Sequence, residues 1–235
     1  MRKRPKTPDR IAGNRMTDTP LYPWSIGSLA RALLFYGQAQ GHADRRVLGA
    51  VAIYYSLFHL GMFLIFACPK HHTSDLRSKI QGRVGSGDDP RQEVSHTAVR
   101  NFLQTCVQRG LSRALSDAFV RAQDLRVFIN YGPRVYWKGS GDISVDTCEH
   151  HNSELAPLRS QLSDIFHDAV RWACTEGADG GIWMPPAIRE VRGFFADNAR
   201  RYYADWCTDE EAHVAESLRA SLEEEARRRV FGNTT

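Results

Sequence analysis

Three segments of the chain carry side chains that could bind a phosphate group and transfer a proton. The first holds Tyr54, Tyr55 and His59 within an uncharged stretch, the second holds His96, and the third runs from Arg126 to Tyr131. An arginine can bind and stabilise a phosphate through its planar fork of donors. A histidine exchanges its proton easily near neutral pH. These residues are therefore the candidates for chemistry on a phosphate-containing ligand.

The order and spacing of these segments resemble the HEPN superfamily of small helical-bundle proteins. Tyr54 to His59 matches a YYxxFH helix, His96 ends a loop, and Arg126 begins an Arg-x4-Tyr pattern just before Gly132. The resemblance covers about residues 25–175. It implies a bundle of four or five helices, often paired into a dimer. Many HEPN proteins are metal-independent endoribonucleases in toxin–antitoxin or phage-defence systems, with an Arg-x4–6-His active site on the helix that pairs across the dimer.

The chain departs from this family pattern at Tyr131, which stands where the active site has its histidine. A tyrosine, with an ordinary pKa of about 10, exchanges a proton poorly at neutral pH. We therefore expect a HEPN-like protein that acts by dimerisation or by binding a protein partner or RNA, within a toxin–antitoxin or antiviral defence module. The alternative is a metal-independent endoribonuclease that uses Arg126 with Tyr131 or His96.

Each of these residues also has a purely structural interpretation. Arg126 could form an ion pair with Asp117 or Asp124, and His59 could be a hydrogen-bonded core histidine. Tyr54 and Tyr55 could be core aromatics with hydroxyls bonded at the edge of the bundle. A second Arg-x4-His pattern runs from Arg91 to His96, but it straddles the end of a glycine-containing stretch and we interpret it as coincidence.

Two clusters contain residue types that bind metal ions. One is Cys68 with His71 and His72, and the other is Cys148 with His150 and His151. Thiolate and imidazole are the usual zinc ligands, but neither cluster has the spacing of a zinc finger. The chain also has no P-loop, Gly-x-Ser-x-Gly or HExxH motif. We therefore expect neither a metal nor an organic cofactor, with these six residues as the candidate ligands if a metal is bound.

The uncharged segment 47–68 could either span a membrane or form the central helix of a bundle. Its polar residues Tyr54, Tyr55, Ser56 and His59 lie near its middle. A spanning helix prefers tyrosines at the two interfaces, and a histidine inside a membrane needs a polar partner. The pattern favours a buried helix and a cytoplasmic protein. A single-pass membrane protein that spans at 47–68 is the third alternative.

Composition indicates an ordinary globular protein. The chain has 235 residues, of which 42% are hydrophobic and 25% charged, and both values are typical of folded domains. Its five cysteines are odd in number and scattered, which indicates free thiols in a reducing compartment. Six basic residues against one acidic residue lie within the first 15 positions, so the rest of the chain is nearly neutral despite the net charge of +4. This charge distribution does not indicate a large nucleic-acid surface.

Apolar periodicity predicts an all-α fold. Residues 1–24 read as a basic flexible tail, 25–175 as an up-and-down helical bundle, and 176–235 as a C-terminal extension of two helices. Residues 69–94 and 133–150 read as long irregular connections, because they contain several glycines or prolines among polar residues. The expected helices are 25–40, 43–68, 96–109, 111–131, 152–175, one from 185 and one from 208.

Overall fold

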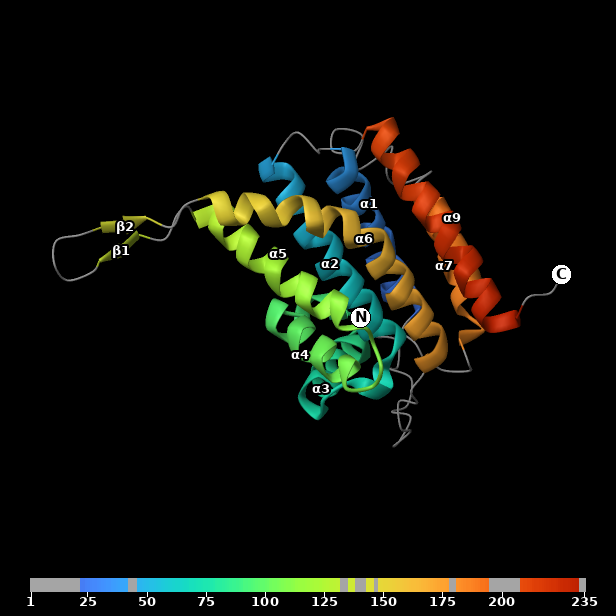
Figure 1. Cartoon of the computed structure of the whole chain (residues 1–235). Coiled ribbons are helices and arrows are strands. Elements are labelled where there is room, and N and C mark those ends of the chain that lie inside the picture. The colour runs from blue at the N-terminus through green and yellow to red at the C-terminus, as the bar shows by residue number, and fades with distance from the viewer. Residues whose placement is uncertain are drawn as a thin grey trace, which may run out of the picture.

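The computed structural model describes residues 22–41, 46–131, 135–137, 143–145, 148–177, 181–194 and 208–232. Helices make up nearly all of these ranges, so the predicted all-α fold is confirmed (Figure 1). The elements along the chain are α1 (Tyr22–Gly41), α2 (Arg46–Ala67), the short helix η1 (Pro69–His71), α3 (Ser74–Ser86), the short helix η2 (Pro90–Glu93), α4 (His96–Val107), α5 (Arg113–Tyr131), β1 (Val135–Trp137), β2 (Ile143–Val145), α6 (Cys148–Glu176), α7 (Met184–Phe194) and α9 (Asp209–Phe231).

Helix α2 lies at the centre of the bundle, where it packs against α1, α4, α5 and α6 (Figure 1). Apolar side chains on all of its sides are buried, among them Ile53, Leu57 and Leu64. Ser56 donates its hydroxyl to the carbonyl of Ala32 on α1 at 2.9 Å, so this buried polar group is satisfied. A helix that is apolar all round is stable in water when other helices enclose it.

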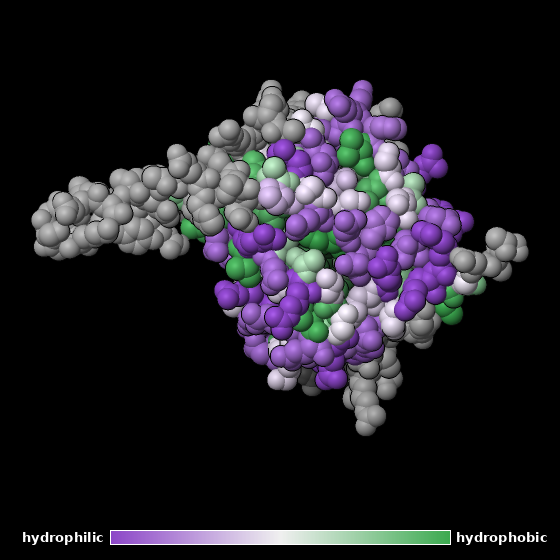
Figure 2. Space-filling view, in the orientation of Figure 1, coloured by the Kyte–Doolittle hydropathy of each residue, from purple (hydrophilic) through white to green (hydrophobic). Residues whose placement is uncertain are grey.

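The segment Val47–Ala67 is long and apolar enough to cross a membrane, and 78% of its most apolar window is buried inside the bundle. That burial is typical of the core helix of a soluble protein, and a bilayer-facing helix would present its apolar side chains outward. Figure 2 shows mainly hydrophilic residues on one face of the molecule, with hydrophobic ones in small separate areas.

The expectation of a long loop over residues 69–94 was wrong, because most of this segment is helical. Thr73 caps the start of α3 by accepting a hydrogen bond from the backbone of Leu76, and Gly87 ends the helix in a left-handed conformation with φ of 80°. Leu76 and Ile80 are buried, with Val84 packed against the same core. This four-residue spacing anchors one side of the helix and offsets the roughly 1 kcal/mol that each internal glycine costs.

Residues 133–150, expected to be an irregular connection, contain two short strands. β1 and β2 form an antiparallel pair in which Tyr136 lies opposite Ser144. Figure 1 shows this pair beyond the ends of α5 and α6. Helix α6 begins at Cys148, several residues earlier than predicted, and α1 begins at Tyr22 within the expected tail. The three residues of β2 are too few to show the alternation that identifies a strand in sequence.

The two C-terminal helices pack on the bundle instead of standing apart from it. α9 contacts α1, α6 and α7, and α7 also contacts α1. A capping box begins α9, because the Thr208 hydroxyl accepts from the backbone of Glu211 while the Glu211 carboxylate accepts from the backbone of Thr208. Four aromatic residues that follow α7 in the sequence lie outside the described residues: Phe195, Tyr202, Tyr203 and Trp206.

Candidate functional site

Helices α2, α4 and α5 bring three of the candidate segments together. Tyr54 on α2 is fully buried, and its hydroxyl is hydrogen-bonded to Nδ1 of His96, the first residue of α4. The guanidinium of Arg126 on α5 lies over the Tyr54 ring, with Cζ 4.9 Å from the ring centroid. The tertiary structure therefore joins Arg126 and His96 through Tyr54, for which the sequence had left both a chemical role and a core role open.

Arg126 is a partly buried cation. Its guanidinium also lies 5.7 Å from the ring centroid of Tyr55, so two aromatic faces support it. Within the described parts of the chain, Nε of Arg126 is buried without a hydrogen-bond partner and no carboxylate pairs with the side chain. The alternative ion pairs with Asp117 and Asp124 are not formed. A cation held on aromatic rings without an anion is electrostatically ready to receive one.

His96 is held in place on both sides. Its ring packs against Phe58 with centroids 4.6 Å apart, while Nδ1 bonds to Tyr54. Burial lowers the pKa of His96, and the nearby charge of Arg126 lowers it further. Burial raises the pKa of Tyr54 to about 12, which exceeds the opposing effect of Arg126. At neutral pH the histidine is therefore neutral and the tyrosine keeps its proton.

The protonation of the His96 ring decides what its other nitrogen can do. If Tyr54 donates its hydroxyl proton to Nδ1, then Nε2 carries the ring proton and acts as a donor. If Nδ1 carries the proton and donates to the tyrosine oxygen, Nε2 is free to accept a proton. Either tautomer fixes the plane of the ring, so Tyr54 is a positioning residue for His96.

The two remaining candidates are Tyr131 and the Arg91-to-His96 pattern, and only the second has its side chains in the described structure. Tyr131 is the last residue of α5, and its side chain lies outside the described part of the structure. Five residues of α-helix turn it about 140° around the axis from Arg126. Arg91 binds the carboxylate of Asp89 at 2.6 Å, so the Arg91-to-His96 pattern makes no such arginine–tyrosine–histidine arrangement.

The residues considered as metal ligands do not converge. His71 uses Nε2 to bind Glu176 at 3.1 Å, and His72 uses Nε2 to bind the carbonyl of Ile65 at 2.8 Å. Cys68 is fully buried, and burial raises the pKa of its thiol. Across the described residues, no group of three or more His, Cys, Asp or Glu side chains could hold a metal ion.

The second ligand cluster lies far from the first along α6. Cys148, His150 and His151 belong to the first turn of this helix, and Glu176, the partner of His71, is its last residue. A helix rises 1.5 Å per residue, so the two ends of α6 are roughly 40 Å apart. A zinc site that draws ligands from both clusters is therefore excluded by the length of the helix.

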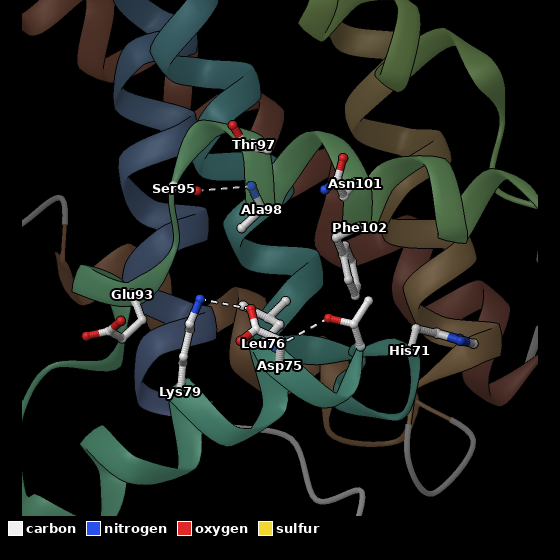
Figure 3. Close-up of a pocket in the computed structure, with 11 residues that line it drawn as sticks. His71, Asp75, Leu76, Lys79, Glu93, Ser95, Thr97, Ala98, Asn101 and Phe102 are labelled. Atoms are coloured by element: carbon white, nitrogen blue, oxygen red, sulfur yellow. Dashed lines mark hydrogen bonds and ion pairs between the residues drawn. The ribbon is translucent and has the colours of Figure 1, made fainter.

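A cavity of about 230 Å³ lies between α3 and the start of α4 (Figure 3). Its charged residues already have partners, since Lys79 binds Asp75 at 2.8 Å and Glu93 binds Arg83 at 2.7 Å. Leu76 and Phe102 contribute its apolar surface. Neither His96 nor Arg126 lines this cavity. Asp75, Lys79 and Glu93 are therefore each neutralised by an ion pair.

Comparison of the chain with protein-family models, with curated proteins and with solved structures gave no match. The resemblance to the HEPN superfamily therefore stays a prediction that depends on the three motifs. The cluster formed by Tyr54, His96 and Arg126 is the best candidate for a functional site in the described structure.

Proposed function

We propose that this chain is a HEPN-like helical protein that acts by association and binds RNA through the phosphate groups that Arg126 can contact. The observation that carries the proposal is the state of the Arg126 guanidinium. It is partly buried, lies over the ring of Tyr54 and has no anionic partner among the described residues. A buried charge is costly unless it is paired. A phosphate oxygen would supply that pair and would accept the unused Nε–H.

The broader parts of the proposal follow from the family resemblance and composition. We propose a homodimer or a complex with a protein partner, within a toxin–antitoxin or phage-defence module in the cytoplasm. The enclosed position of α2 supports a protein without a membrane span. Recovery of the full-length chain in the soluble fraction without detergent tests that point, and retention in the membrane fraction would favour the single-pass alternative.

A metal-independent endoribonuclease is the second candidate, because His96 is held neutral close to Arg126. In that reaction Nε2 of His96 would take the proton of a ribose 2′-hydroxyl, whose oxygen would attack the adjacent phosphorus. The bond from phosphorus to the 5′-oxygen would break, and that oxygen would leave with a proton from the protonated histidine or from water. Arg126 would bind the charged phosphate throughout. The alternative pairing of Arg126 with Tyr131 has less support, because a tyrosine with its ordinary pKa of about 10 exchanges a proton poorly at neutral pH.

Binding and cleavage of RNA by the purified full-length protein separate these two candidates. Fluorescence anisotropy with a labelled RNA measures binding, and gel analysis of the same RNA in EDTA measures metal-independent cleavage. The test variant is Arg126→Gln, and the matched control is Arg113→Gln, an exposed arginine at the other end of α5. A buried charge-assisted contact predicts at least a tenfold loss of affinity in Arg126→Gln, with little change in the control.

The outcomes assign the function. RNA that is bound but not cut supports the association protein. Cleavage in EDTA that disappears in both Arg126→Gln and His96→Gln would establish the endoribonuclease in its place. Equal affinity in wild type, Arg126→Gln and Arg113→Gln would reject Arg126 as the phosphate contact. Unfolding curves should show that Arg126→Gln is folded, since the substitution removes an unpaired charge.

A further inference from the structure

A stack of three partly buried rings lies next to Arg126 and adjoins the ring of Tyr54. Phe35 of α1 stacks on Tyr55 with centroids 5.2 Å apart and planes 28° apart, and on His59 with centroids 5.7 Å apart and planes 6° apart. Tyr55 and His59 are four residues apart on α2 and face the same way. We call Phe35, Tyr55 and His59 the ring stack. All three side chains keep some exposure to solvent.

Three arginines from three different elements act on the ring stack, one by direct contact and two by their charge. Arg126 of α5 lies over Tyr55, and the positive charges of Arg31 and Arg91 both act on His59. Arg91 of η2 lies beside Gly27 of α1. One nitrogen of its guanidinium is 3.4 Å from the position that a Cβ on Gly27 would occupy. Arg91 is bonded to Asp89, and the charge of Arg31 also acts on that carboxylate. Nε of Arg126 has no hydrogen-bond partner among the described residues.

His59 has an unused polar atom beneath this surface. Its Nδ1 is buried and has no hydrogen-bond partner in the described part of the chain, so the predicted hydrogen-bonded core histidine is not found there. Burial lowers the pKa of His59 to about 3, and the charges of Arg31 and Arg91 act in the same direction. The ring is therefore neutral at physiological pH and presents a flat aromatic surface among arginines.

We infer that the ring stack and its arginines hold a stretch of single-stranded nucleic acid, with a base against the rings and phosphates on Arg31 and Arg126. This inference rests on the proposed function and extends it by naming the form of the ligand and a second contact surface. Aromatic rings interleaved with cations bind single strands, because every base has a face that can stack and every nucleotide has a phosphate. In a duplex the bases already stack on one another and cannot reach such rings.

The charge of the surface argues against a second copy of the chain as the occupant. In a symmetric dimer the same patch occurs on both subunits and meets itself. The patch contains three arginines and one carboxylate, that of Asp89. Two such patches would place arginines opposite arginines, and like charges placed opposite one another disfavour association. A polyanion with aromatic faces complements both features of the surface at once.

Binding of a fluorescent ten-nucleotide single-stranded RNA to the full-length protein tests the inference. Phe35→Leu keeps an apolar side chain but removes the ring, and Phe231→Leu does the same at an exposed phenylalanine on α9. Stacking energies of single bases predict that Phe35→Leu weakens binding about tenfold, with no change in Phe231→Leu. Because every variant keeps the basic N-terminal residues, their contribution to affinity cancels.

A charge variant keeps the test valid if Phe35→Leu unfolds. Arg31→Gln should reduce the slope of log affinity against log salt by about 0.7, the value for one phosphate contact on a single strand. Arg113→Gln should leave that slope unchanged. A blunt RNA duplex should bind more weakly than the single strand to the wild type, and a DNA strand of the same sequence shows whether the ribose hydroxyl matters.

Each result decides between the two levels of the proposal. If Arg126→Gln weakens binding while Phe35→Leu and Arg31→Gln do not, the ring stack is rejected and the proposed function stands. If Phe35→Leu and Arg31→Gln weaken binding while Arg126→Gln does not, the ring stack is supported and Arg126 is rejected as the primary contact. Conversion of a dimer to a monomer by Phe35→Leu, measured by light scattering, would overturn the inference and identify the surface as a subunit interface.

Discussion

Replacement of Gly37 by alanine tests how the C-terminal helix is attached to the bundle. A Cβ at position 37 would lie 2.2 Å from the carbonyl oxygen of Glu211 and 3.0 Å from its carbonyl carbon. These atoms belong to the backbone of α9, so no side-chain rotation can relieve the overlap. Helix α9 would have to move away from α1 by about 1 Å to restore ordinary contact distances.

The expected loss of stability follows from two opposing terms. Overpacking of this kind costs about 1–3 kcal/mol. Alanine in place of glycine inside a helix contributes about 0.5–1 kcal/mol in the opposite direction. The net prediction is a destabilisation of about 1–2 kcal/mol, and for a chain of this size each kcal/mol lowers Tm by about 2–4 °C. Gly37→Ala should therefore unfold roughly 2–8 °C below the wild type.

Gly82→Ala provides the matched control, because no atom lies within 4 Å of an added Cβ at this position in α3. The same helix-propensity term then acts alone and should stabilise the protein by about 0.5–1 kcal/mol. Thermal unfolding followed by far-UV circular dichroism measures both variants. If Gly37→Ala unfolds at or above the wild-type temperature, the close contact between α1 and α9 is refuted.

Three further predictions concern the capping box, the buried histidine and the cysteines. Thr208→Ala removes the hydroxyl that caps α9 and should lower the free energy of unfolding by about 1 kcal/mol in urea titrations; an unchanged midpoint would contradict the cap. The pKa of His59 falls to about 3 in the folded state, whereas the ordinary pKa of a histidine is about 6.5. Between these two pH values the unfolded chain binds a proton at His59 and the folded chain does not. Stability should therefore decrease as pH falls over that range, and His59→Phe should reduce this decrease by up to about 1.4 kcal/mol per pH unit; identical pH profiles by chemical denaturation would refute the assignment. Burial raises the thiol pKa of Cys68, Cys106 and Cys174, so iodoacetamide at pH near 8 should modify them only after denaturation, as read by mass spectrometry; rapid labelling of the native protein at any of the three would show that the core is open there.

Helices with a clear apolar period were predictable from local sequence. The spacing of Val99, Phe102, Leu103 and Cys106 predicted α4, and all four side chains are buried as expected. The capping box from Thr208 to Glu211 predicted the start of α9 from residue types alone. The glycines of α3 led to the wrong prediction of a loop. The buried contacts of Leu76 and Ile80 outweigh the low helix propensity of these glycines.

The candidate site was predictable only in part. The types of Arg126 and His96 identified both as candidates, since guanidinium and imidazole have few equivalents for binding phosphate and exchanging protons. The contact of both residues with Tyr54 could not be predicted from the sequence, because the three residues lie on separate helices that are far apart along the chain. The same holds for the ring stack, in which Phe35 of α1 was assigned no role.

The sequence by itself determined that the chain forms helices, that the uncharged segment needs complete shielding, and that Arg126 and His96 carry reactive groups. Those properties depend on residue types and on spacing within a single turn or two of helix. Only the tertiary structure decided which helices shield α2, which rings support Arg126, and that the two clusters of possible metal ligands lie at opposite ends of α6. Such contacts depend on how helices distant in sequence pack against one another, and no local pattern encodes that packing.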